Sequence, residues 1–238
     1  MTERIIKSNE RVKEHGEVFT PRRIVNLMLN QKELKAPLSS LSTTFLEPAA
    51  GEGAFLTEIL RRKMLLAVRL SNDLDSYEQN SLIALCSLYG IELMEDNVKL
   101  LAMNMYQTFF NQYSKEATKY GGKVNTHVIE SAKVIISANM AEGDALKQIT
   151  KDGQPIILSE WKLLPIKRNI RKVHRIEYTL TAIINNEGPV VSGTVERTSK
   201  QLSLFADDDH SETSAAYEFL PVKITEVYKQ KMIKTEPL

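Results

Sequence analysis

Three acidic residues follow short apolar runs of the sequence at points where a polar ligand could be bound. Glu47 closes Phe45-Leu46-Glu47, Glu92 closes Tyr89-Gly90-Ile91-Glu92, and Asp144 comes after a third expected strand. In an open α/β sheet the carboxyl ends of parallel strands share one edge, and ligands bind outside that edge. A carboxylate there can accept hydrogen bonds from the hydroxyl, amine or cationic groups of a ligand. We therefore expect the three acids to line one binding site.

A glycine-containing turn separates Glu47 from the helix that we expect after it. The turn reads Pro48-Ala49-Ala50-Gly51-Glu52-Gly53, and apolar residues then recur at helical spacing from Leu56 to Val68. Because glycine has no Cβ, Gly51 and Gly53 allow a sharp turn and a close approach of a ligand to the backbone. A strand, this loop and an amphipathic helix together predict a first βα unit.

Two of the three acids also have a simpler interpretation. Glu92 could be a solvated acid at a strand end, and Gly143-Asp144 is a common pair in capped turns.

Three further helix starts can be read from the sequence. Asp73 is expected to begin one helix and Asp96-Asn97 to cap another. Thr20-Pro21 is expected to begin a helix with Ile24, Leu27 and Met28 on one face.

The composition is that of a globular protein with enough apolar residues for a core. Of 238 residues, 42% are hydrophobic and 26% are charged, and the net charge is +1, so any surface that binds nucleic acid must be local. The single cysteine, Cys86, excludes an internal disulfide and a zinc site built from cysteines. We find no signal peptide and no apolar stretch of membrane-spanning length, and we expect a cytoplasmic protein.

The acids and the loop carry a resemblance to a known family. The string Glu-Pro-Ala-Ala-Gly-Glu-Gly-Ala-Phe at residues 47–55 resembles the S-adenosylmethionine-binding motif of the DNA adenine N6-methyltransferases of restriction-modification systems. Residues 17–21, 89–93 and 143–146 resemble further motifs of that family, in the same order. The resemblance implies an α/β protein with a Rossmann-like methyltransferase core and a small β-rich C-terminal extension.

The resemblance also implies S-adenosylmethionine as the cofactor and assigns roles to residues. Phe19 and its neighbours would flank the methionine end, Glu92 would accept the ribose hydroxyls, and Asp144 would accept the adenine amine. The cofactor-binding residues expected on this basis are Phe19, Thr20, Glu47, Pro48, Ala49, Gly51, Gly53, Glu92, Leu93, Asp144 and Ala145.

The sequence departs from the family in one essential motif. Catalysis in the family uses Asp/Asn-Pro-Pro-Tyr/Phe, which holds the amine of a flipped adenine in line with the methyl group. None of the eight prolines here is adjacent to another. The catalytic residues are therefore unknown, and we expect a split or degenerate enzyme, in which a second subunit would supply this motif and the target-recognition domain. A methyltransferase for another substrate, with a catalytic strand after residue 146, is a third possibility.

The C-terminal third offers two candidate interaction sites. Two expected strands, 155–161 and 176–184, enclose a basic stretch that is either a solvated loop or a sequence-independent contact to double-stranded DNA. Its candidate residues are Lys167, Arg168, Arg171, Lys172 and Arg175. The pentapeptide Gln201, Leu202, Ser203, Leu204 and Phe205 is similar to the peptide by which bacterial proteins dock onto the replication sliding clamp. The alternative function is therefore a non-catalytic module that binds DNA or the clamp.

These patterns divide the chain into five parts. We expect a polar N-terminal arm at 1–15, a cofactor-binding domain at 16–150 and a small β extension at 151–195. A flexible linker that contains the clamp-like peptide is expected at 196–216, and a C-terminal segment of ambiguous type at 217–238.

Overall fold

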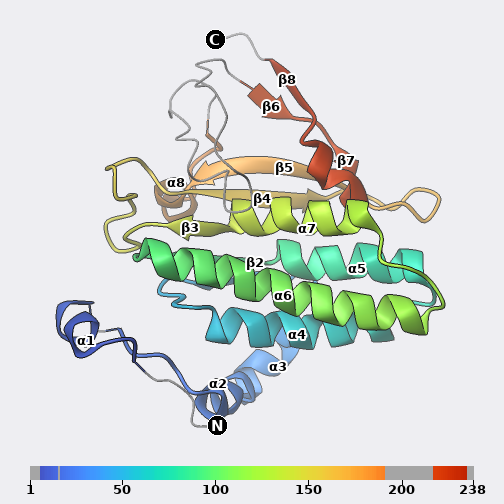
Figure 1. Ribbon diagram of the computed structural model, residues 1–238. Helices are drawn as coiled ribbons and strands as arrows, with labels where there is room; N and C mark the ends of the chain where they lie inside the picture. The colour runs from blue at the N-terminus through green and yellow to red at the C-terminus, as the bar shows by residue number, and fades with distance from the viewer. Residues whose placement is uncertain (1–5, 16, 191–216, 235–238) are drawn as a thin grey trace.

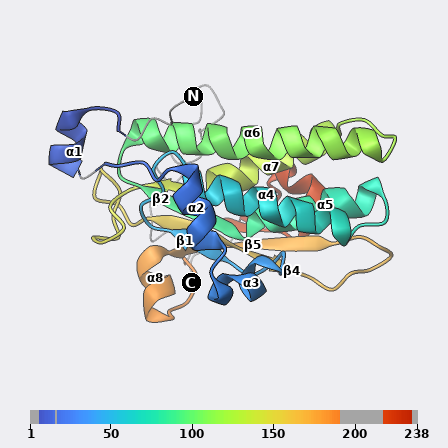
Figure 2. The same cartoon turned by 90° about the horizontal axis from the view of Figure 1, so that it is seen from below.

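A computed structural model describes residues 6–15, 17–190 and 217–234 of the chain. Three strands form a parallel sheet in the order β1 (Phe45–Glu47), β2 (Leu88–Glu92) and β3 (Met140–Glu142). All three were expected from the sequence. Because the order in the sheet follows the order in the chain, the two crossovers lie on the same face of the sheet (Figure 2).

Four helices make up those crossovers and cover that face. The first crossover contains α4 (Ala54–Arg69) and α5 (Leu74–Cys86), and the second contains α6 (Glu95–Lys119) and α7 (Thr126–Asn139). The main core lies between these helices and the sheet, and its fully buried members include Leu60, Leu101 and Phe109. Asp73 caps α5 through a capping box with Ser76, as the sequence predicted.

The N-terminal region contains α1 (Asn9–His15), α2 (Arg22–Leu29) and α3 (Lys32–Leu38). In both views α1 lies beyond the carboxyl edge of the sheet, near the start of α6 (Figures 1 and 2). The prediction for α2 was wrong in two details. Pro21, not Thr20, is the N-cap, and the buried residues are Val25 and Leu29 whereas Leu27 and Met28 are exposed.

An antiparallel region follows the parallel sheet. The strand β4 (Ile157–Leu163) pairs with β5 (Lys172–Thr179), β5 pairs with β7 (Val222–Lys223), and β6 (Tyr217–Phe219) pairs with β8 (Met232–Lys234). A 3₁₀ segment, η2 (Ile224–Lys229), packs on α7 (Figure 1). Trp161, Val173, Ile224 and Val227 belong to the same core as the four crossover helices, so this region packs as a continuation of the main body.

The expected strand 176–184 was wrong in its second half. The chain leaves β5 after Thr179 and forms α8 (Leu180–Asn185). The Thr179 side chain accepts a hydrogen bond from the Ala182 N–H, which caps the helix. A run rich in β-branched residues predicts a strand, but the capping threonine and the burial of Leu180 stabilise a helical turn here.

The structure is mixed α/β, in agreement with the expected class. No helix in the part of the chain that the structure describes is both long and apolar enough to cross a membrane. The same residues contain no group of histidine, cysteine and acidic side chains arranged to hold a metal ion.

Candidate functional site

The glycine loop after β1 is fixed by two contacts to the end of β2 and by one contact to α6. The Ala50 N–H donates to the Ile91 carbonyl at 2.9 Å, and the Gly51 N–H donates to Glu92 Oε2 at 2.8 Å. The Asn104 side chain of α6 donates to the Glu52 carbonyl at 2.8 Å. The first two strands and their loop therefore form one rigid unit at the carboxyl edge of the sheet.

Both glycines of the loop adopt backbone conformations that favour glycine. Gly51 has φ +54° and Gly53, the N-cap of α4, has φ +88°. A Cβ on Gly53 would lie 2.6 Å from Leu101 Cδ1, which is too close. A Cβ on Gly51 would lie 3.6 Å from the Phe19 ring, so Phe19 lies directly against the loop.

Glu92 is a buried carboxylate that several donors orient. Besides the Gly51 N–H at Oε2, its Oε1 atom accepts from the Met94 N–H at 3.1 Å and from Asn97 Nδ2 at 3.3 Å. The side chain is 8% exposed. Since an ionised carboxylate has about four acceptor positions, Glu92 retains capacity for a ligand hydroxyl.

Asn97 is a site residue that sequence reasoning assigned to another role. The prediction that Asp96-Asn97 caps the helix was wrong, because α6 begins at Glu95 with Met94 as N-cap. Asn97 is 1% exposed, and its amide nitrogen donates to both Glu92 and Glu17. The signal that could have revealed it is its position, five residues after the acid that closes β2.

Glu47 has a different environment from Glu92. It ends β1 and is partly buried, and its side-chain carboxyl accepts no hydrogen bond within the described part of the chain. Loss of solvent around the carboxyl raises the pKa of Glu47 to about 7 from its ordinary value of 4.5. A partly buried carboxyl without a protein partner is a suitable counter-ion for a cationic ligand group.

Asp144 follows β3 and caps a turn. Its Oδ1 atom accepts from the Leu146 and Lys147 N–H groups, both at 3.0 Å, and its Oδ2 atom pairs with Lys147 Nζ at 3.0 Å. These contacts with the backbone and side chain of Lys147 lower the pKa of Asp144. The three acids thus follow three adjacent strands, and the capped-turn interpretation of Asp144 is correct whether or not it also contacts a ligand.

The other expected cofactor residues lie around these groups. Thr20 precedes α2, Pro48 and Ala49 belong to the glycine loop, Leu93 follows Glu92 and is half exposed, and Ala145 follows Asp144. No contact among residues 6–15, 17–190 and 217–234 distinguishes their roles, so their cofactor assignments stay predictions.

The basic stretch separates into an exposed turn and a buried arginine. Lys167 and Ile170 exchange backbone hydrogen bonds around a two-residue turn, in which Arg168 and Asn169 have positive φ. Lys167, Arg168 and Lys172 are exposed, whereas the Arg171 side chain donates to the Leu164 carbonyl of its own hairpin. The turn and the first residue of β5 therefore present three of the five candidate DNA-binding side chains to solvent.

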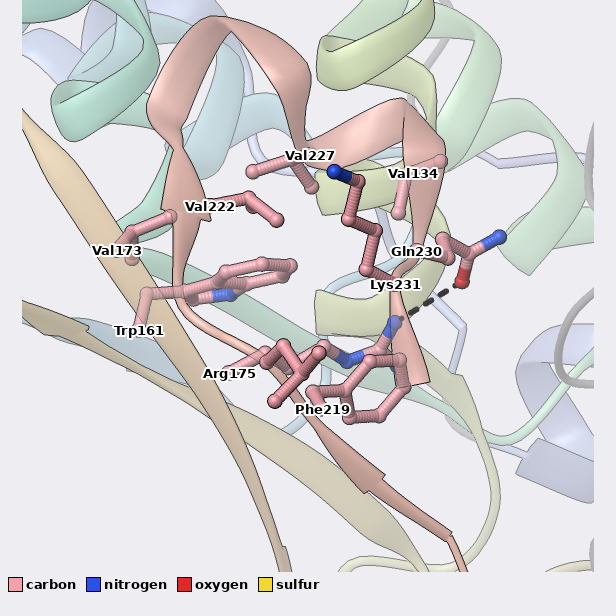
Figure 3. Close-up of a pocket in the computed structure, with 10 residues that line it drawn as sticks. Val134, Trp161, Val173, Arg175, Phe219, Val222, Val227, Gln230 and Lys231 are labelled. Carbon is pink, nitrogen blue, oxygen red and sulfur yellow. Dashed lines mark hydrogen bonds between the residues drawn. The ribbon is translucent and has the colours of Figure 1, made fainter. Parts of the chain in front are cut away.

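Arg175 is held in a small cavity far along the chain from the glycine loop (Figure 3). Its guanidinium lies 4.4 Å from the Phe219 ring centre and 5.5 Å from that of Trp161, and it donates to Ser159, Gln230 and Glu177. With 8% exposure, Arg175 joins β5 to β6 and η2, and we remove it from the candidate DNA contacts. Trp161 is a core residue whose N–H donates to Asn139.

The clamp-like peptide Gln201–Phe205 lies outside the described residues.

A glycine loop and a following helix at the carboxyl edge of a parallel sheet are features of the class of open α/β proteins, in which ligands bind outside that edge. Comparison with family models identifies the family within that class. The model for N-6 DNA methylases matches residues 2–137, more than half of the chain. The protein belongs to the N-6 DNA methylase family. Searches of curated proteins and of solved structures gave no significant match.

Proposed function

We propose that this protein is the S-adenosylmethionine-binding part of a DNA adenine N6-methyltransferase with a Rossmann-like core. The observation that carries the proposal is the contact of Glu92 with the Gly51 N–H. The contact holds Glu92, the acid that would accept the ribose hydroxyls, beside a loop that a ligand can approach closely, in a chain of the N-6 DNA methylase family.

The chemistry of the cofactor fits the groups around this loop. S-adenosylmethionine presents a sulfonium, an ammonium, a ribose diol and an adenine amine, and none of these requires a phosphate-binding lysine. Glu92 would accept the diol, Glu47 would face a cationic group, and Phe19 would pack beside the methionine end. Asp144 would accept from the adenine amine if its contacts with Lys147 rearrange.

We further propose that methyl transfer needs a second polypeptide. The sequence has no adjacent prolines and therefore lacks the motif that would hold the target amine. The edge of β1 that is unpaired in the part of the chain that the structure describes also supports the need for a second polypeptide. A doubly wound sheet continues on both sides of its first strand, and the ligand lies where the strand order reverses. Within the described residues β1 pairs only with β2, and its other edge is unpaired.

The experiment measures cofactor binding and methyl transfer on the same preparation of the full chain. Equilibrium dialysis with labelled S-adenosylmethionine should give saturable binding, and incubation with adenine-containing duplex DNA should give no labelled DNA. Labelled DNA from the chain alone would refute the need for a second subunit. Absence of binding would refute the cofactor proposal.

Double-stranded DNA is the proposed partner of the exposed hairpin turn. Lys167, Arg168 and Lys172 would neutralise phosphates, so binding should weaken steeply with salt and be independent of sequence. Replacing all three by alanine should reduce the salt dependence of binding to a random duplex. As a control, Lys13, Lys115 and Lys123 can be replaced instead, which removes the same total charge elsewhere. An equal reduction in the salt dependence of DNA binding in both triple variants would exclude a specific role for the turn.

A second candidate function rests on the pentapeptide Gln201–Phe205. A module that binds the sliding clamp would lose binding when Leu204 and Phe205 are replaced by alanine, whereas Lys200→Ala should retain it. Unchanged retention of the double variant on immobilised clamp would rule out this function.

A further inference from the structure

The N-terminal arm, residues 6–15, lies at the carboxyl edge of the sheet beside the candidate cofactor site (Figures 1 and 2). None of residues 6–14 is buried. Apolar packing therefore contributes little to the position of the arm, and its polar contacts must hold it.

Two cations of the arm make those contacts. Lys7 Nζ pairs with Asp96 Oδ2 at 3.0 Å and with Glu52 Oε1 at 3.2 Å, and it also donates to Asn97 Oδ1. Glu52 belongs to the glycine loop, so Lys7 joins the arm to the site. The same ammonium lies 5.8 Å from the centre of the Phe19 ring.

Arg11 makes the second set of contacts. Its guanidinium donates two hydrogen bonds to Glu17, at 2.6 and 2.7 Å, and two to Asp96, at 2.8 and 3.1 Å. These bonds raise the pKa of Arg11 and lower that of Asp96, so both remain charged at neutral pH. Arg11 thereby connects the arm to the segment before Phe19 and to the first turn of α6.

Asn97 connects this network to Glu92. Its Oδ1 atom accepts from Lys7, and its Nδ2 atom donates to Glu17 and to Glu92. A displacement of the arm would therefore change the hydrogen bonds of the residue that orients the proposed ribose acceptor. The buried side chain of Asn97 therefore connects the N-terminal arm to the Glu92 carboxylate.

We propose that the N-terminal arm is a cover over the cofactor site, held closed by Lys7 and Arg11 and opened for cofactor entry and release. This inference rests on the proposed function. Partly exposed ion pairs are individually weak and are screened by salt. The arm can therefore open while the core stays folded, and the closed arm slows exchange of bound S-adenosylmethionine.

The test measures the association and dissociation rates of labelled S-adenosylmethionine with the full chain. The variant Lys7→Gln/Arg11→Gln should increase both rates by about five-fold or more, because the cover no longer closes. Raising the salt concentration should speed dissociation from the wild type but have little effect on the variant. Lys13→Gln, an exposed lysine on the same helix, is the control and should leave both rates unchanged.

The outcomes separate the cover from the cofactor proposal. Binding by the wild type, with dissociation from the double variant within two-fold of the wild type, would refute the cover alone. Failure of the wild type to bind would refute the proposed function and the cover with it. Thermal unfolding of the double variant checks that the core stays folded, because none of residues 6–14 is buried but Glu17, which loses its pairing with Arg11, has a side chain that is only 8% exposed. Glu17→Gln, which removes the carboxylate that pairs with Arg11, should also speed dissociation.

Discussion

The backbone N–H of Gly51 donates a 2.8 Å hydrogen bond to the Oε2 atom of Glu92. The two residues are 41 positions apart in the chain, and they meet because β1 and β2 are parallel neighbours. This bond fixes the glycine loop against the acid that we assign to the ribose. Any ligand in this corner contacts a preorganised site, which reduces the ordering cost of binding.

The raised pKa of Glu47 predicts that stability decreases as pH rises. With a pKa of about 7 in the fold against 4.5 ordinarily, the folded protein holds a proton that the unfolded chain has already released. The free energy of unfolding should fall between about pH 4.5 and 7, with Glu47 contributing about 1–3 kcal/mol after allowance for its partial exposure. Glu47→Gln should remove this contribution, as urea unfolding at pH 5 and pH 8 can measure. Equal pH dependence in both proteins would contradict the shift.

The same carboxyl predicts a pH dependence of cofactor binding. A cationic ligand group favours the ionised carboxylate, so affinity for S-adenosylmethionine should rise from pH 6 to pH 8 with proton release below pH 7. Titrations in two buffers of different ionisation enthalpy measure that proton. In Glu47→Gln the proton release should disappear. Its persistence would assign the titration to another group.

Gly53 predicts a steric requirement in the loop. Gly53→Ala combines a positive φ with a Cβ 2.6 Å from Leu101 Cδ1, and should cost about 2–4 kcal/mol of unfolding free energy. Gly121→Ala is the matched control, because Gly121 has φ +74° and nothing within 4 Å of the added Cβ. It should cost only about 1 kcal/mol. If urea unfolding gave equal losses of unfolding free energy for Gly53→Ala and Gly121→Ala, crowding by Leu101 would be unimportant.

Replacement of the buried Lys63 side chain should cause a large loss of stability. Its side chain is fully buried, and Nζ donates to Ser87 Oγ at 2.6 Å and to the carbonyls of Leu41 and Thr43. Burial lowers its pKa to about 7. Lys63→Met would leave those acceptors unpaired and should cost about 2–4 kcal/mol. Lys99→Met, at a largely exposed site, should change stability by less than about 0.5 kcal/mol.

The strands that carry the acids could be predicted because their signals are local. An apolar run that ends in an acid and a glycine turn specifies β1 and its loop, and Asp73 with Ser76 specifies the start of α5. The family resemblance was confirmed over residues 2–137. The cofactor roles of the individual residues stay predictions.

Features that depend on distant partners could not be predicted. Asp96 and Asn97 have the composition of a helix cap, but Lys7 and Arg11, more than 80 positions earlier, bind them instead. Lys63 belongs to an amphipathic helix, where a lysine is normally exposed, and it is buried because three acceptors surround it. Arg175 continues a basic stretch, but it packs against Trp161 on the paired strand β4 and against Phe219 of β6, a contact with a distant segment that the sequence does not reveal.

Calorimetric titration with S-adenosylmethionine, on the wild type and on Glu92→Gln, tests the proposed function most directly. The amide keeps the shape of the side chain and can still accept from the Gly51 N–H, but it loses the charge that favours the ribose hydroxyls. We predict saturable binding by the wild type, at least about ten-fold weaker binding by Glu92→Gln, and unchanged binding by Glu95→Gln, an exposed acid at the start of α6. Equal binding by wild type and Glu92→Gln, or no binding by either, would contradict the assignment.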